Sequence, residues 1–275
     1  MTVREGFLRA KQALSEEEAR ILMEELFGWG RLALSELAQQ PLTAQQEQRL
    51  QTALQQRANG VPLQYIIGHW WFMDRDYAVG EGVLIPRDDT EVAVRQALSF
   101  LHPIAAPKVT DLCAGSGIIA LTIAQERPDA AVAAVEKEPA ALTYLHRNNQ
   151  AYGSPVTVLP GDIFTCHTDI QDASLDLLVA NPPYIRTALL PTLQREVQRE
   201  PMTALDGGQD GLAFYRCIAA DWTRKLKPGG GIVLEIGEEQ AAAVTALLAV
   251  SGIGHLQTLQ DIQGLDRVIF GTMKP

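Results

Sequence analysis

The tetrapeptide Asn181-Pro182-Pro183-Tyr184, which follows the apolar segment 177–180, carries the clearest chemistry in the chain. An amide nitrogen is a poor nucleophile, because its lone pair is delocalised into the carbonyl, and both of its N–H donors must be accepted and aimed. The side-chain oxygen of Asn181 and the backbone carbonyl of Pro182 can each accept one N–H, while Tyr184 can pack on the amide plane. Positioning of this kind can supply roughly 7–11 kcal/mol of a reaction barrier. The tetrapeptide therefore predicts a site that methylates a planar, amide-type nitrogen.

The two prolines predict that this segment is rigid. They fix φ and prevent both continuation of the strand and an immediate helix. The tetrapeptide is therefore expected at the carboxyl end of a strand, where open α/β sheets bind ligands. A proline-stiffened turn capped by Asn181 is the alternative, and Asn-Pro alone would fit it. The motif contains no obvious general base, so the proton is expected to leave as the C–N bond forms or after it.

The segment 109–120 has the pattern of a strand, a glycine turn and the start of a helix. Gly115 and Gly117 let the backbone approach a ligand closely, and the first N–H groups of the following helix can hold polar ligand atoms. Asp111 can lie near a cationic aminoacyl group, and no pyrophosphate-binding signature accompanies the glycines. These two details favour S-adenosylmethionine, although the glycines also match a dinucleotide fingerprint. A tight turn with ordinary capping is the alternative without a ligand.

Acidic residues follow the next two predicted strands. Glu136 can accept both hydroxyls of a ribose. Asp162 can accept the amino group of an adenine, while Ile163 supplies apolar cover for the base. Each acidic residue also has a purely structural interpretation: a solvated carboxylate at a strand end for Glu136, and a common Gly-Asp turn for Asp162.

Composition and charge narrow the class of protein. The 275 residues suffice for one good-sized core and a smaller domain. The apolar runs are too short to cross a bilayer, and no secretory signal is visible at the amino terminus. The 3 cysteines show no close pairing, which favours a reducing, cytoplasmic location, and the 5 scattered histidines predict no metal site. The net charge of −10 argues against a nucleic-acid partner, because phosphate contacts usually need a basic surface.

The pattern of elements changes along the chain. Up to about Gly60 it is helical, and capping boxes beginning at Ser15 and Thr43 mark two helix starts. The segments 71–73 and 77–79 then predict a hairpin. Beyond them, strands alternate with helices, which predicts a mostly parallel sheet covered on both faces. The expected strands are 108–112, 131–135, 156–159, 175–180, 231–236 and an antiparallel edge pair at 255–259 and 267–271; the expected helices are 5–13, 16–29, 31–39, 47–58, one beginning at 88–91, 117–126, 138–150, 210–226 and 238–251.

The glycine loop, Glu136 and Asn-Pro-Pro-Tyr, in this order, resemble the class I methyltransferases that act on amide or exocyclic amino nitrogens. The flanking segments more narrowly resemble the peptide-chain release factor glutamine methyltransferases (PrmC, also called HemK), over nearly the whole chain from residue 60 onward. These segments are PLQYIIG at 62–68, VLIPR at 83–87 with Thr90-Glu91, Glu200-Pro201, ALDGG at 204–208, DGL at 210–212 and Tyr215-Arg216.

The resemblance implies methyl transfer from S-adenosylmethionine to N5 of the glutamine in the Gly-Gly-Gln loop of class 1 release factors. It also implies a seven-stranded, Rossmann-like methyltransferase fold with the tetrapeptide as the glutamine clamp. We accordingly expect a helical release-factor-docking domain at 1–68, a β-hairpin linker at 69–86 and a methyltransferase domain at 87–275, in a monomer that binds neither nucleic acid nor membrane. The expected cofactor contacts are Asp111, Cys113, Ala114, Gly115, Ser116, Gly117, Glu136, Asp162, Ile163 and Asn181.

The chain departs from the family pattern at Asp88-Asp89, where Pro-Glu is usual, at Glu136, where Asp is usual, and at Cys113, where Gly is usual. Four other functions stay open. They are a ribosomal-protein glutamine methyltransferase with the same clamp, a DNA or RNA amino-methyltransferase that stacks Tyr184 on a flipped base, an NAD-linked oxidoreductase and a non-catalytic binding module. The segment 204–208 favours the release factor, and the acidic charge disfavours the nucleic acids.

Overall fold

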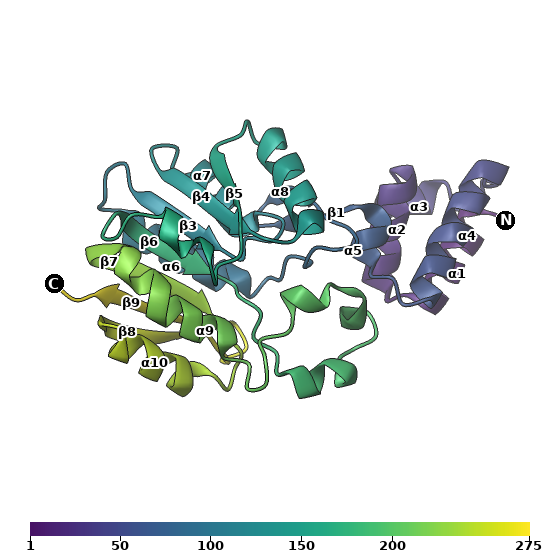
Figure 1. Ribbon diagram of the computed structural model, residues 1–275. Coiled ribbons are helices and arrows are strands. Elements are labelled where there is room, and N and C mark those ends of the chain that lie inside the picture. Colours follow the sequence, from purple (N-terminus) through teal and green to yellow (C-terminus); the bar gives the residue numbers. More distant parts are fainter. The chain divides into compact units, whose positions relative to one another are not determined.

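The structure is a computed structural model that describes residues 1–275 and divides into two compact units (Figure 1). The first unit comprises Met1–His69 together with Gln194–Arg199, and the second comprises Trp70–Leu193 together with Glu200–Pro275. No pattern in the sequence predicts that a short stretch from the second half of the chain joins the first unit. No helix has both the length and the apolar character needed to cross a membrane.

The first unit is helical, and its apolar core gathers around side chains such as Leu22 and Leu50. The capping boxes predicted at Ser15 and Thr43 are confirmed, and a third at Thr2 begins the first helix. Each box satisfies backbone N–H groups that the first turn of a helix leaves without a partner. The helices are α1 (Val3–Ala13), α2 (Glu16–Phe27), α3 (Arg31–Glu36), α4 (Ala44–Ala58) and α5 (Leu63–Ile67).

Polar contacts tie the segment 194–199 to the end of α4 within the first unit. Nη1 of Arg57 lies 2.6 Å from Oε1 of Glu196, and this ion pair is largely shielded on the arginine side. Nη2 of Arg199 donates a hydrogen bond of 2.8 Å to the carbonyl oxygen of Asn59. The chain that follows the tetrapeptide therefore returns to the helical unit before it resumes the second unit.

The second unit is built on a seven-stranded sheet in which only one strand runs antiparallel to the others, as the sequence predicts. The order is β5-β4-β3-β6-β7-β9-β8, and β9 is the antiparallel strand. The chain runs outward from β3 to β5 and then returns to place β6 beside β3, which creates the switch point where ligands of such sheets bind. The strands are β3 (Lys108–Leu112), β4 (Ala131–Glu136), β5 (Val156–Pro160), β6 (Leu175–Ala180), β7 (Leu226–Glu235), β8 (Ile253–Gln260) and β9 (Asp266–Met273).

Alternate residues of the central strands bury their side chains in two separate cores. In β6, Leu177 and Val179 join the core beneath α6 (Thr90–Leu101) and α7 (Ile118–Glu126), together with Leu145 of α8 (Pro139–Ala151). Leu178 and Ala180 join the core beneath α9 (Ala213–Cys217) and α10 (Ala241–Val250). The sheet is thus covered by helices on both faces, which holds the carboxyl ends of its strands rigidly in place.

The hairpin precedes the sheet, but its register differs from the prediction. It pairs β1 (His69–Phe72) with β2 (Arg75–Ala78), so the turn is Met73-Asp74 and not the three residues 74–76. Met73 has φ 47° and Asp74 has φ 60°, the left-handed backbone of a two-residue hairpin turn. The missed register has a physical reason, because such turns usually contain Asn or Gly and neither stands here.

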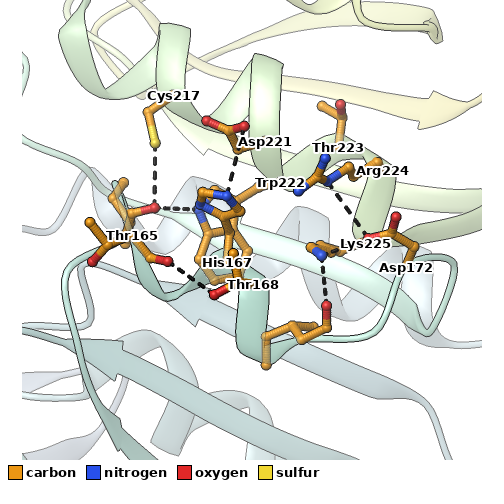
Figure 2. A network of polar contacts seen from close by, with 12 residues as sticks. Thr165, His167, Thr168, Asp172, Cys217, Asp221, Trp222, Thr223, Arg224 and Lys225 are labelled. Carbon is orange, nitrogen blue, oxygen red and sulfur yellow. Dashed lines mark hydrogen bonds and ion pairs between the residues drawn. The ribbon is translucent and has the colours of Figure 1, made fainter.

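The helix predicted over 210–226 is wrong as one continuous element. The α-helical part is only Ala213–Cys217, and a π-helical turn at Ile218–Trp222 and a 3₁₀ turn at Thr223–Lys225 follow it. The wider turn lets Trp222 reach the interior while Lys225 is also buried. Nζ of Lys225 donates to the carbonyl oxygen of Ile170 and to Asp172, each at 2.6 Å, which satisfies the buried charge (Figure 2).

Candidate active site

An open cavity lies in the second unit, where the segments that follow β3, β4, β5 and β6 meet. Nine of the residues proposed from the sequence line this cavity: Cys113, Ala114, Gly115, Ser116, Glu136, Asp162, Ile163, Asn181 and Pro183. The other four proposed residues do not line it: Asp111, Gly117, Pro182 and Tyr184. No group of three or more His, Cys, Asp and Glu side chains is arranged to hold a metal ion.

The glycine loop after β3 has three residues in the left-handed region of the backbone: Cys113 with φ 59°, Gly115 with φ 59° and Gly117 with φ 88°. A Cβ atom at Gly115 would meet no atom of the protein within 4 Å, so this face of the loop is open. A Cβ atom at Gly117 would overlap the Cδ1 atom of Leu145 in the core. Gly115 therefore leaves space in front of the loop, and Gly117 allows α7 to begin close to α8.

Glu136 ends β4 with its carboxylate fixed by the backbone. Oε2 accepts the N–H of Gly115 at 2.8 Å, and Oε1 accepts the N–H groups of Lys137 and Glu138, each at 2.8 Å. Burial raises the pKa of Glu136, while these three hydrogen bonds act in the opposite direction. A carboxylate has about four lone-pair sites, so about one remains for a ligand hydroxyl.

Asp162 and Ile163 follow β5 and are held by separate partners. Oδ1 of Asp162 accepts the N–H of Phe164 at 3.0 Å. The carbonyl oxygen of Ile163 accepts the indole N–H of Trp222 at 2.9 Å and the thiol of Cys217 at 3.4 Å; Figure 2 labels these two donors. The π-helical turn described above therefore has a local purpose, because it brings two buried donors onto one carbonyl at the cavity wall.

Asp111 lies beneath the loop and is fully buried. Its Oδ2 atom accepts the N–H of Ala120 at 3.1 Å, and its Oδ1 atom has no hydrogen-bond partner. Burial raises the pKa of Asp111 well above its ordinary value. The sequence placed this carboxylate near an aminoacyl group, whereas the structure places it behind the residues that line the cavity.

The tetrapeptide follows β6, and its two prolines are buried. Nδ2 of Asn181 lies 3.3 Å from Oγ1 of Thr90, the buried first residue of α6, and donates to it. The amide nitrogen of Asn181 is thus engaged, and its oxygen is the atom left to accept an N–H from a ligand. Burial raises the pKa of Tyr184 to about 12, so its phenol is neutral at physiological pH.

Glycines after the tetrapeptide bring a second backbone segment against it. The N–H of Ile185 donates to Leu205 at 2.9 Å, and the N–H of Gly207 donates back to Ile185 at 2.8 Å. Nε2 of Gln240 adds a hydrogen bond of 3.0 Å to the carbonyl of Tyr184. The roles of Thr90, Gly207 and Gln240 were not predicted from the sequence; the clustered glycines at 207–211 are the one local signal of a close backbone approach.

Asp89, at one of the positions where the chain departs from the family pattern, forms an ion pair. Oδ2 of Asp89 lies 3.5 Å from Nε of Arg267, whose Nη2 also lies 3.0 Å from Oδ2 of Asp261. Beside them, Arg87 pairs with Glu200, a buried carboxylate that also accepts the N–H of Ile85 at 2.9 Å. These contacts anchor the segment 85–89 that leads into α6 and Thr90.

Known proteins match both parts of the chain. Residues 4–68 match the PrmC N-terminal domain family, and residues 87–202 match the Methyltransferase small domain family. The chain is 41% identical to a release factor glutamine methyltransferase of Moorella thermoacetica, with 97% of each chain covered. It is 40% identical to the protein of the same name in Geobacter sulfurreducens, covering 97% of this chain and 93% of that one.

The fold is also similar to that of the hMettl16 catalytic domain, solved in complex with an RNA hairpin of a 3′UTR. The TM-score is 0.61 at 11% identity, and the match covers 98% of this chain and 93% of that one. At this identity, the likeness shows a shared fold only.

Proposed function

Because the chain belongs to the family of release factor glutamine methyltransferases, we propose that it methylates N5 of the glutamine in the Gly-Gly-Gln loop of class 1 release factors. It is an enzyme, a protein-glutamine methyltransferase that depends on S-adenosylmethionine. The observation that carries the proposal is the amide of Asn181, whose nitrogen is taken by Thr90. The oxygen of this amide is then an acceptor at the cavity wall, and an acceptor selects a substrate that presents N–H.

The cofactor fits the glycine loop, because the open side of Gly115 is the space that a Cβ atom would fill. When bound, S-adenosylmethionine supplies an electrophilic methyl group on its sulfonium sulfur. We assign cofactor contacts to the loop 113–117, to the fixed carboxylate of Glu136 and to Asp162 and Ile163. Asp111 would serve the cofactor site indirectly, from behind the loop, through its buried Oδ1 atom, which has no hydrogen-bond partner. Gly117 would serve by letting α7 start where its N–H groups face the cofactor.

We assign substrate binding to the tetrapeptide. Oδ1 of Asn181 and the carbonyl of Pro182 each accept one N–H of the substrate amide; Asn181 and Pro183 line the cavity, and Pro182 lies between them in the chain. The neutral ring of Tyr184 packs on the amide plane. These acceptors face the nitrogen that becomes positively charged during transfer, so they stabilise the transition state more than the ground state. As the C–N bond forms, the bond from the methyl carbon to the sulfonium sulfur would break and leave a neutral thioether, and the proton would then leave the nitrogen to water.

We further propose that residues 1–68 dock the release factor and that the enzyme acts as a monomer in the cytoplasm, without contacting nucleic acid. Three features support this. The 3 cysteines are free thiols, which suits a reducing compartment. The net charge of −10 is unsuited to phosphate contacts. The first unit has its own apolar core, as a docking domain requires.

The experiment that tests the proposal offers labelled S-adenosylmethionine and three acceptors to the purified full-length protein. The acceptors are a class 1 release factor, ribosomal proteins and nucleic acid. We expect label on the release factor alone. Label on a ribosomal protein or on nucleic acid, with none on the release factor, would overturn the assignment of the substrate and leave the methyltransferase activity standing.

A further inference from the structure

A buried carboxylate that the proposed roles do not use lies beside the substrate clamp. In the sheet, Ala180 of β6 pairs with Leu234 of β7, so the next residues along these parallel strands are Asn181 and Glu235. Glu235 is only 1% exposed, and its Oε2 atom has no hydrogen-bond partner. A carboxylate in such a place costs stability unless it is well paired, so its position calls for a reason.

The side chains around Glu235 are placed so that they can form a directed chain of hydrogen bonds. Thr90 and Asn181 both lie near its carboxylate, and each lowers its pKa as a hydrogen-bond donor would. Thr90 is fully buried and also accepts from Nδ2 of Asn181 at 3.3 Å. Because an ionised carboxylate only accepts, a hydrogen bond between Thr90 and Glu235 has the Thr90 hydroxyl as its donor, and the oxygen of that hydroxyl is left to accept from Asn181. The face of the Asn181 amide turned toward this pair must therefore be its NH₂ group.

We propose that Glu235 is a positioning residue for methyl transfer: directly and through Thr90, it holds the NH₂ group of Asn181 so that the amide oxygen meets the N–H of the substrate. The inference rests on the proposed role of Asn181 as the substrate acceptor. Without Glu235 the Asn181 amide can rotate by half a turn. Its NH₂ group, a donor, then faces the N–H of the substrate, which is also a donor. The negative charge of Glu235 also polarises the Asn181 amide, since a charged partner strengthens each bond of a hydrogen-bonded chain.

Charged groups on the neighbouring elements set when Glu235 is ionised. Burial raises the pKa of Glu235 to about 7, and the negative charge of Asp89 acts in the same direction. Thr90, Arg267 and Asn181 act in the opposite direction. The phenol of Tyr184, raised to a pKa of about 12, stays neutral, and Tyr215 donates its hydroxyl to the carbonyl of Glu235 at 2.8 Å. The clamp is therefore ordered in the ionised state, which forms as pH rises through neutrality.

The test uses four variants of the full-length enzyme. Thr90→Val removes the hydroxyl while keeping the shape of the side chain, and Thr90→Ser keeps the hydroxyl. Glu235→Gln removes the charge. Thr122→Val is the matched control, because Thr122 is also fully buried and its hydroxyl bonds to Tyr77 at 2.8 Å, outside this chain of hydrogen bonds. The measurements are kcat and KM with the release factor, affinity for S-adenosylhomocysteine, and the dependence of kcat on pH.

We expect Thr90→Val and Glu235→Gln to lower kcat at pH 8 by at least about tenfold, with cofactor affinity unchanged. Thr90→Ser and Thr122→Val should retain kcat. The wild-type rate should rise with pH through about 7, and this rise should disappear in Glu235→Gln. The proposal is overturned if Glu235→Gln keeps the wild-type rate and pH profile, or if Thr90→Val behaves like Thr122→Val.

The proposed substrate and the positioning role fail in different ways. If the wild type methylates a ribosomal protein or another amide instead of the release factor, the substrate is wrong, and the same variants are compared on that acceptor. Binding of a glutamine-containing acceptor peptide, measured with S-adenosylhomocysteine in place, gives a readout that needs no turnover. Weaker peptide binding by Thr90→Val than by Thr90→Ser supports the positioning role, and equal binding contradicts it.

Discussion

The backbone of Gly207 lies directly against the backbone of Tyr184. A Cβ atom on Gly207 would come within 2.7 Å of the Cα atom of Tyr184 and within 2.8 Å of the carbonyl oxygen of Pro183. The N–H of Gly207 also donates to Ile185 at 2.8 Å, which closes the contact. The segment 204–208 therefore supports the substrate clamp, and it can pack this closely because Gly207 has no side chain.

Gly207→Ala should displace the clamp, because the new methyl group meets backbone and not the end of a flexible side chain. A shift of about 1 Å at a reacting group can cost on the order of a hundredfold in rate, so we expect a loss of kcat of that order. Gly30→Ala is the control, since its Cβ atom would meet only the Glu24 side chain at ordinary contact distance. Steady-state kinetics of the two variants check the prediction; equal kcat values would contradict it.

Gly115→Ala and Gly117→Ala should separate ligand binding from folding. At Gly115 the added methyl group projects into open space before the loop, so affinity for S-adenosylhomocysteine should fall by at least about tenfold. At Gly117 it overlaps Leu145, so the free energy of unfolding should fall by about 1–3 kcal/mol more than at Gly115. Calorimetric titration and urea denaturation measure the two effects.

Gly153→Ala controls for backbone strain in this comparison, because Gly153 has φ 81° and open space at its Cβ position. It should lose stability as Gly115→Ala does and keep cofactor affinity. If Gly115→Ala binds S-adenosylhomocysteine as tightly as Gly153→Ala does, the loop does not hold the cofactor.

Cys113 stands in a left-handed backbone conformation, with φ 59°, that favours glycine. An L-residue pays about 1–2 kcal/mol there. Cys113→Gly and Cys113→Ala both lose the thiol, but only the alanine keeps this cost. The glycine variant should therefore unfold at higher urea concentration, with a free energy of unfolding about 1 kcal/mol greater. Equal midpoints for the two variants would count against strain at this position.

The buried charge of Glu235 should make stability depend on pH. Its pKa rises from 4.5 to about 7 on folding, so the folded protein holds this proton more tightly than the unfolded chain. The stabilising contribution is present below about pH 4.5 and is lost as pH rises through about 7. Between pH 5 and pH 8 the wild type should lose on the order of 1–3 kcal/mol that Glu235→Gln does not lose.

Urea denaturation of both proteins at the two pH values checks this difference. Glu81→Gln, at an exposed position, should follow the wild type. If the stabilities of wild type and Glu235→Gln change in parallel with pH, the carboxylate does not titrate in this range. A gain in stability with a loss of rate would show that the enzyme sacrifices stability for an ordered clamp.

Much of the fold follows from local patterns. The strands Lys108–Leu112 and Leu175–Ala180 begin and end where the sequence predicts, because the glycine turn marks the end of the first and the second is a mostly apolar run bounded by turns. The capping boxes at Ser15 and Thr43 mark helix starts through contacts between residues only three apart. Such signals need no knowledge of the rest of the molecule.

The parts that could not be predicted depend on contacts between distant residues. The break after Cys217 exists because Trp222 must reach the carbonyl of Ile163, and no periodicity records that partner. Glu235 has the pattern of a polar residue at the end of a strand. Only the pairing of β6 with β7 brings it to Asn181, and that pairing is set by the whole sheet.

The central claim is that the Asn181 amide clamps a release-factor glutamine for methylation. The most direct measurement is tandem mass spectrometry of a class 1 release factor after reaction with the wild type and with Asn181→Ala. We predict one added methyl group on the side-chain nitrogen of the Gly-Gly-Gln glutamine with the wild type. Asn181→Ala should produce almost none, while still binding S-adenosylhomocysteine. A methyl group on another residue, or full methylation by Asn181→Ala, would contradict the account.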